Sequence, residues 1–319
     1  MREPSTCSPP RSELRRRFCR RFTAALERAG EETVATWDVD VIRLVCRDPS
    51  PVLTPRFDEY HASVSLSATL HPDWFYRDRC GLDPTRTRSL RIPSPFPPDN
   101  RLVLAVRGVS TAFKHRGRDR DKVLAQLEAC AAAVPGNVAM FFGSFEQLRD
   151  LFESLELPGR ERLMQRPDLD EAGRAELLAA LREPGPPKVM AAVLGGAFGE
   201  GVDLPNGALQ AAIIVGPALP PPSIERQLIQ AWYEDRFDQG FDLAFVHPGM
   251  TRVVQAAGRV VRGPEERGAV VLLCQRFVRY QFASFLPEEW TPRATNRPAE
   301  LLGEFFRYQN DGGTPPKNM

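Results

Sequence analysis

The 319-residue sequence is poor in lysine, and this shortage excludes one class of nucleotide site. A phosphate-binding loop of the Gly-x-x-x-x-Gly-Lys-Ser/Thr kind needs a lysine directly after a glycine to reach the terminal phosphates. No lysine in this sequence follows a glycine, so the chain contains no such loop. All but four of the 42 basic residues are arginines, the exceptions being Lys114, Lys122, Lys188 and Lys317.

Paired cysteines and long apolar runs are also missing. The six cysteines form no Cys-x-x-Cys pair, a pattern typical of reduced thiols in a cytoplasm and not of a disulfide framework. No stretch is long and apolar enough to cross a membrane, and the basic residues 1–22 are not followed by an apolar export core. We therefore expect a cytoplasmic protein without membrane contact and without a metal site of its own.

Strong charge of one sign is absent as well. The 42 basic and 41 acidic residues nearly cancel, so any contact with nucleic acid must come from a local patch or from the amides at helix starts. Residues 11–29 predict a basic helix, in which Leu14, Phe18, Phe22 and Leu26 recur at four-residue spacing. Its arginines fit a solvated face or a surface that faces nucleic acid.

Four short blocks occur in a fixed order along the chain. They are Ser67-Ala-Thr-Leu70, Met140-Phe-Phe-Gly-Ser-Phe145, Phe198-Gly-Glu-Gly-Val-Asp-Leu-Pro205 and Gln255-Ala-Ala-Gly-Arg-Val-Val-Arg262. Together they resemble the later motifs of superfamily 2 helicases, and among these the DinG/XPD-type DNA helicases. The likeness spans roughly residues 60 to 290. It implies the second RecA-like motor domain of a helicase that uses ATP to move 5′-to-3′ along single-stranded DNA.

The last block carries the predicted catalytic residues. We expect it to open a helix, with Arg259 and Arg262 on one face so that both guanidinium groups reach a single polyphosphate. The resemblance implies that the two arginines act as arginine fingers on a nucleotide held by the partner motor domain. It also implies that Gln255 places the attacking water or the terminal phosphate. Gly258 lacks a side chain, so a nucleotide or another backbone can approach closely.

The third block supplies two acidic residues. Glu200 and Asp203 flank Gly201, which allows a tight turn that directs both carboxylates to the interdomain cleft. The resemblance implies that Asp203 accepts hydrogen bonds from ribose hydroxyls or orients an arginine of the last block. The alternative is a structural salt bridge between Asp203 and Arg259.

The first two blocks are predicted to contact DNA and to couple movement to the nucleotide. The resemblance implies that Ser144 binds a DNA phosphate at a helix start, and the alternative is a plain helix cap. It also implies that Ser67 and Thr69 couple the nucleotide state to movement between motor domains, and the alternative is an ordinary Ser/Thr turn.

Parts of the family pattern are altered or missing. Gly199 occupies a place that is usually aromatic, and Cys274 one where aspartate is common. Asp58-Glu-Tyr-His61 spells a magnesium-binding box, but Pro51 and Pro55 precede it and exclude the central strand that such a box requires, so we reject it. ATP and Mg²⁺ are therefore expected to be held mainly by the first motor domain, and an iron–sulfur cluster is not expected in this chain.

The order of the apolar segments predicts an α/β fold with a parallel sheet and helices on both faces. Residues 1–70 are predicted to be a short, mainly helical remnant of the first motor domain, residues 71–100 a connector, and residues 101–319 the RecA-like helicase domain. Expected strands are residues 41–45, 101–106, 137–142, 188–194, 211–215 and 268–273, and residues 63–69 are expected to form a strand and turn. Expected helices are residues 119–134, 145–155, 223–238 and 251–262.

The expected function is that of one half of a DNA motor, with single-stranded DNA and the missing first motor domain, in cis or in trans, as partners. Alone, the chain is expected not to hydrolyse ATP. The alternative is a stand-alone, non-catalytic module that binds nucleic acid or protein. A third hypothesis, an unrelated nucleotide enzyme, would need a phosphate loop and metal carboxylates that the sequence lacks.

Overall fold

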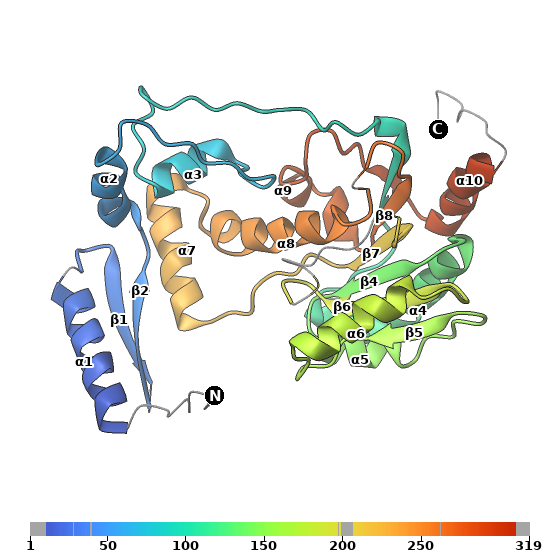
Figure 1. Ribbon diagram of the computed structural model, residues 1–319, viewed down its shortest axis with the longest axis horizontal. Coiled ribbons are helices and arrows are strands. Elements are labelled where there is room, and N and C mark those ends of the chain that lie inside the picture. Colours follow the sequence, from blue (N-terminus) through green and yellow to red (C-terminus); the bar gives the residue numbers. More distant parts are fainter. Residues whose placement is uncertain are drawn as a thin grey trace, which may run out of the picture.

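The computed structural model describes residues 11–27, 29–38, 40–196, 198, 207–261 and 263–310. In Figure 1 the sheet and the helices that cover it form one part of the molecule, and α1, the β1–β2 hairpin and α2 lie at the opposite end. Helix α7 (Ile224–Phe237) lies between these two parts.

A parallel sheet of seven strands forms the centre of the fold. The strand order is β5-β6-β4-β7-β8-β3-β9, and every recorded pairing in this sheet is parallel. The strands are β3 (Arg101–Val106), β4 (Val138–Phe142), β5 (Glu161–Met164), β6 (Lys188–Val193), β7 (Ala211–Val215), β8 (Gly268–Leu272) and β9 (Arg293–Thr295).

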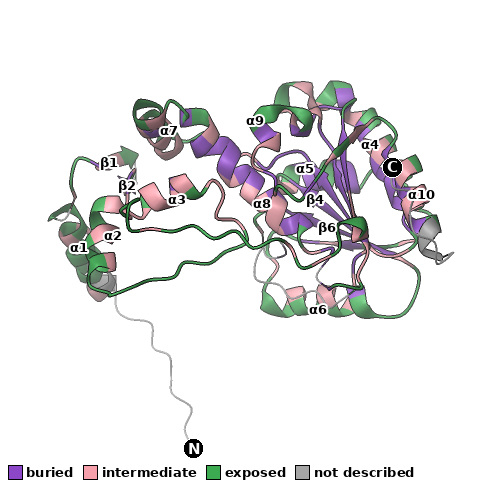
Figure 2. Ribbon diagram, turned by 90° about the horizontal axis from the view of Figure 1, so that it is seen from above, coloured by how far each residue is buried: buried purple, intermediate pink, exposed green. Residues whose placement is uncertain are grey.

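Both faces of the sheet are covered by apolar packing. Strands β4, β6, β7 and β8 are buried along their whole length, which explains why their sequences are almost entirely apolar; Lys188 at the start of β6 is a charged exception. Alternate side chains enter two separate cores. Helices α6 (Glu171–Arg182) and α8 (His247–Ala257) cover one face; α4 (Arg116–Ala133), α5 (Phe145–Phe152) and α10 (Pro298–Asn310) cover the other. Figure 2 shows the buried strands between these layers.

Most expected elements of the sheet layer are confirmed within a few residues. Helix α7 (Ile224–Phe237) starts at the predicted Ser223 cap, where the Arg226 amide donates to Ser223 Oγ. Strand β5 and helix α6 were not predicted. Strand β5 is a short edge strand with one fully buried residue, Leu163, so its sequence carries no apolar run.

The amino-terminal part combines helices with a two-stranded sheet. Helix α1 (Arg11–Glu27) confirms the predicted basic helix, and β2 (Val41–Cys46) pairs with β1 (Thr33–Asp38), which was not predicted. The rejected magnesium box begins at the last residue of α2 (Ser50–Asp58), in agreement with its rejection. Residues 63–69 were expected to form a strand and turn. The strand is wrong, because residues 63–67 adopt no regular structure, whereas residues 68–69 form a turn.

The predicted connector contains an ordered helix, α3 (Asp73–Arg79). Its Phe75 is fully buried in a third apolar cluster with Tyr233 of α7 and Leu243. The cluster lies outside the two cores of the sheet and attaches residues 73–79 to α7.

Candidate nucleotide and nucleic-acid sites

The block Gln255–Arg262 closes a helix and does not open one. Helix α8 follows directly from a π-helical turn at Asp242–Val246, begins at His247 and ends at Ala257, with Gly258 as its C-cap. Arg259 lies in the turn beyond that cap, so the expectation that it lies on a helical face is wrong. Arg262 lies outside the described residues. The physical reason is the early start of α8, because Pro248 is tolerated in the first turn of a helix.

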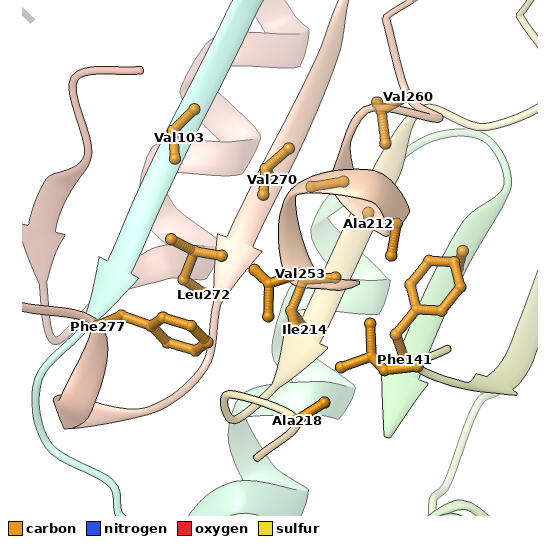
Figure 3. Close-up of a cluster of buried hydrophobic side chains, with 14 of the residues drawn as sticks. Val103, Phe141, Ala212, Ile214, Ala218, Val253, Val260, Val270, Leu272 and Phe277 are labelled. Atoms are coloured by element: carbon orange, nitrogen blue, oxygen red, sulfur yellow. The ribbon is translucent and has the colours of Figure 1, made fainter. Parts of the chain in front are cut away.

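Helix α8 runs antiparallel to the strands. A methyl group at Gly249 would lie 3.1 Å from the Ala218 backbone, just beyond the end of β7. At the other end of the helix, a methyl group at Gly268, where β8 begins, would meet Val260 Cγ1. Figure 3 shows the same arrangement, with Val260 beside the strand starts and Ala218 beyond the strand ends. Arg259 therefore lies near the amino-terminal edge of the sheet.

Gln255 carries an unsatisfied polar atom in the last turn of α8. Its Oε1 is buried and has no hydrogen-bond partner among the described residues. A buried amide oxygen without a partner costs about 1–3 kcal/mol, and other buried side-chain atoms in the described part of the chain, Thr36 Oγ1 and Arg77 Nε among them, share this state. The side chain thus presents an acceptor within the block that the sequence assigns to catalysis.

The third block begins next to α8. A methyl group at Gly195, just after β6, would lie 2.8 Å from Arg252 Nε of α8. Phe198 is buried in the same core as α8. The predicted residues Glu200, Gly201 and Asp203 lie outside the described residues.

Ser144 lies where the sequence places it, between β4 and α5. The Gln147 amide donates to Ser144 Oγ (3.2 Å), and Gln147 Oε1 in turn accepts from the Gly143 amide (3.0 Å). This reciprocal arrangement caps the helix. Ser144 is half-buried and Gly143 is exposed, so the start of α5 remains open to a ligand. The helix cap is present, and the DNA contact stays a prediction.

The Ser67 and Thr69 side chains form a local turn. The Thr69 amide donates to Ser67 Oγ (3.2 Å), and the two hydroxyl oxygens are also 3.2 Å apart. Ser67 is exposed and Thr69 is half-buried. These contacts match the ordinary turn, and the coupling role stays a prediction.

A cavity that the sequence did not reveal lies between α4 and α5. Its volume is about 310 Å³, and its wall includes Phe113 and Arg116 from the α4 side. The run Lys114-His115-Arg116-Gly117-Arg118 next to an aromatic residue was the sequence signal that could have indicated it.

Cys274 occupies the place where the family resemblance predicts aspartate. Burial raises the pKa of its thiol, but the hydrogen bond with Thr111 and the charge of Arg276 together lower it by more. The pKa of Cys274 therefore lies below its usual value. Arg276 Nη2 also lies 3.4 Å from Thr111 Oγ1. The thiol thus occupies a site that favours negative charge.

Among the described residues, no group of three or more His, Cys, Asp or Glu side chains could hold a metal ion. Likewise, none of the helices in this part of the chain is long and apolar enough to span a membrane.

Known proteins with similar sequences are helicases. A probable ATP-dependent helicase of Methanocaldococcus jannaschii is 27% identical over 231 residues, 67% of this chain and 34% of that protein. The general transcription and DNA repair factor IIH helicase subunit XPD of Dictyostelium discoideum is 25% identical over 79% of this chain, and the ATP-dependent DNA helicase YoaA of Escherichia coli is 28% identical over 70%. The chain spans about a third of the length of these relatives.

Solved structures confirm the predicted fold. An apo XPD structure matches 89% of this chain and 59% of its own with a TM-score of 0.64 at 17% identity. The structure of S. tokodaii Xpd4 matches 92% of this chain and 61% of its own with a TM-score of 0.54 at 15% identity. The seven-stranded sheet with helices on both faces thus has a fold that matches the second RecA-like helicase domain of XPD.

The model of the helicase C-terminal domain family matches residues 127–293, more than half of the chain. This match agrees with the helicase relatives and with the fold. The chain belongs to the helicase C-terminal domain family.

Proposed function

We propose that this chain is the second motor domain of an ATP-dependent helicase that moves 5′-to-3′ along single-stranded DNA. In this proposal residues 1–70 are a remnant of the first motor domain, residues 71–100 a connector and residues 101–319 the motor domain itself. The complete motor requires a partner domain that holds ATP and Mg²⁺, because the sequence has no phosphate loop.

The observation that carries the proposal is the unsatisfied Oε1 of Gln255. A buried acceptor without a partner fits a group that is satisfied by an attacking water or a nucleotide in the assembled motor. Gln255 lies three residues before Gly258 and four before Arg259 in the family's last motif. In the proposal, Gln255 orients the water, and the bound nucleotide supplies the phosphoryl group that is transferred to it.

Arg259 and Arg262 act as the arginine fingers. A guanidinium group matches phosphate oxygens through parallel hydrogen bonds and stabilises negative charge that develops during phosphoryl transfer. Glu200, Gly201 and Asp203 complete the nucleotide site, with Asp203 bonded to the ribose or to an arginine of the last motif. Gly258 gives the nucleotide room to approach.

Single-stranded DNA binds along the carboxyl edge of the sheet. Ser144 is half-buried at the start of α5, where free amides and the helix dipole favour a phosphate. Ser67 and Thr69 couple the nucleotide state to relative movement of the motor domains.

The test is Arg262→Ala in the complete motor, with the first motor domain supplied in cis or in trans. Loss of a finger is expected to lower the ATPase rate by about a thousandfold or more, while affinity for single-stranded DNA is unchanged. Arg307→Ala, an exposed arginine in α10, is the matched control and should retain full ATPase activity. ATPase activity that survives in Arg262→Ala would contradict the finger assignment.

A further inference from the structure

The cavity between α4 and α5 contains chemistry that the proposed function does not use. It opens at the carboxyl edge of the sheet, between the loop after β3 and the start of α5, and its volume is about 310 Å³. That volume lies at the lower end of the range for small-ligand pockets, about 300–1,000 Å³. Helices α4 and α5 both pack into the same core, on one face of the sheet.

The cavity wall is held by contacts that fix its shape. Arg120 of α4 donates from Nε to Asp150 Oδ1 of α5 (3.0 Å) and from Nη2 to Ser154 Oγ (2.7 Å). On the other side, the Ser110 amide donates to the buried carboxylate of Asp119 (3.0 Å). Both α4 and the loop after β3 are therefore anchored without a ligand.

An aromatic ring lies at the entrance of the cavity. Phe113 is 82% exposed, which is unusual for so large an apolar side chain. The guanidinium carbon of Arg116 lies 5.4 Å from the centre of the Phe113 ring, and Arg116 Nε is buried without a hydrogen-bond partner among the described residues. An exposed ring beside a cation is the combination that binds unpaired bases and their phosphates.

The interior of the cavity fits a base better than a phosphate. Val123 and Leu151 provide apolar wall, and Ser110 and Thr111 provide hydroxyl groups. The carboxylate of Glu146 also lines it, and within the described part of the chain Glu146 makes no recorded ion pair or side-chain hydrogen bond. A free carboxylate repels phosphate but accepts hydrogen bonds from the amino group of cytosine or adenine.

We propose that this cavity binds one unpaired nucleobase of the single-stranded DNA. Phe113 stacks on the base, Glu146 accepts a hydrogen bond from its amino group, and Arg116 contacts the adjacent phosphate. The inference rests on the proposed function, in which the strand passes Ser144 at the start of α5, next to this cavity. The surface is otherwise expected to bind only the sugar-phosphate backbone. The pocket adds one contact to it that distinguishes between bases.

The test compares the full chain on three single-stranded oligonucleotides: oligo-dC, oligo-dT and an oligonucleotide of the same length with abasic sites. Stacking of one base contributes about 1–3 kcal/mol, or about 5-fold to 150-fold in Kd. The wild-type chain should therefore bind oligo-dC at least about fivefold more tightly than the abasic strand, and more tightly than oligo-dT.

Two variants and one control separate the contributions. Phe113→Ala should lose the preference for bases over abasic sites, while its Kd for the abasic strand stays that of the wild type. Glu146→Gln should keep that preference but lose the preference for oligo-dC over oligo-dT. Trp37→Ala removes another exposed aromatic side chain, 78% exposed on β1 and outside the cavity, and should behave as the wild type.

The outcomes distinguish this inference from the proposed function. If Phe113→Ala retains the preference for bases, or if the wild type shows none, the base pocket is refuted and DNA binding by the motor domain stands. If the wild-type chain binds none of the three strands, DNA binding by this domain fails, and the base pocket fails with it.

Discussion

At the scale of single residues, the buried Oε1 of Gln255 has no hydrogen-bond partner among the described residues, and Ser144 Oγ accepts the Gln147 amide at the start of α5. The cap at Ser144 follows from a Ser-x-x-Gln pattern, and the structure contains the corresponding contacts. The unsatisfied oxygen of Gln255 could not be predicted, because burial and the absence of a partner depend on the packing of α8 against the sheet. The cavity near Phe113 was missed for the same reason, since its wall comes from segments about thirty residues apart.

Replacing Gln255 is predicted to raise the stability of the chain and to lower the ATPase activity of the motor. Gln255→Met replaces the unsatisfied amide oxygen by an apolar group of similar size, so the free energy of unfolding should rise by about 1 kcal/mol. In the complete motor the same variant should lose ATPase activity, because the acceptor for the water is gone. Urea unfolding of the chain and ATPase assays of the motor measure the two effects.

The matched control for this prediction is Gln281→Met. The Gln281 amide donates to Asp242 Oδ1 (2.5 Å), so this change removes a satisfied hydrogen bond and should not stabilise the chain. A lower stability of Gln255→Met would show that Oε1 has a partner in solution and would remove the observation that carries the proposed function.

At the scale of elements, apolar runs were sufficient to locate the strands, but not every boundary. Strands β4, β6, β7 and β8 are buried on both faces, so their sequences are mostly apolar, and these apolar runs allowed the strands to be predicted. Helix α8 was placed four residues too late, because His247-Pro248-Gly249 resembles a helix break although proline is favoured in a first turn. The α8 start is instead decided by tertiary packing, since His247 is buried against the segment that precedes α3.

The buried His247 predicts a dependence of stability on pH. Burial lowers the pKa of His247 from 6.5 to about 4, although a hydrogen bond to the His71 carbonyl raises it. The carbonyl can only accept, so His247 Nε2 donates to it (3.1 Å), and the Tyr76 hydroxyl lies 3.3 Å from the same nitrogen. The neutral form is therefore the one that fits the folded state.

The sign of the effect follows from proton binding. Between pH 6.5 and 4 the unfolded chain binds a proton at His247 that the folded chain does not, so stability falls as the pH falls through this range. A difference of about 2.5 pKa units corresponds to about 3 kcal/mol, and the loss should level off below pH 4. Unfolding free energies measured at pH 7, 5.5 and 4 test this.

Substitutions separate the contribution of His247 to the pH dependence of stability from that of the carboxylates, which also titrate in acid. His247→Leu should be less stable than the wild type at pH 7, and the difference between the two should shrink as the pH falls to 4. His61→Gln alters an exposed histidine and should leave the pH profile unchanged. Parallel profiles for His247→Leu and the wild type would refute the assignment.

At the scale of the whole molecule, two packing units share one helical segment. The π-helical turn at Asp242–Val246 places Leu243 and Phe245 in the cluster with Phe75, and α8, which follows directly, places Val253 in a core of the sheet. The ion pairs of Arg236 with Asp48 (2.5 Å) and Asp78 (2.8 Å) add polar links between α7 and the amino-terminal part. None of this was predicted from sequence, since residues 71–100 were expected to be only a connector.

The cluster around Phe75 should open without opening the sheet. Phe75 is 1% exposed and makes edge contacts with Tyr233 and His247, so Phe75→Ala is expected to cost about 3–5 kcal/mol locally. The third cluster is separate from both sheet cores, and local unfolding follows such divisions. Amide hydrogen exchange in α3 and α7 should therefore accelerate in this variant, while β4 and β7 keep their protection.

Phe18→Ala, at a ring that is 58% exposed on α1, is the control and should change neither group of amides. Equal acceleration in α7 and β4 would mean that the two units unfold together, and the movement of α3 and α7 would then be inseparable from the stability of the motor domain.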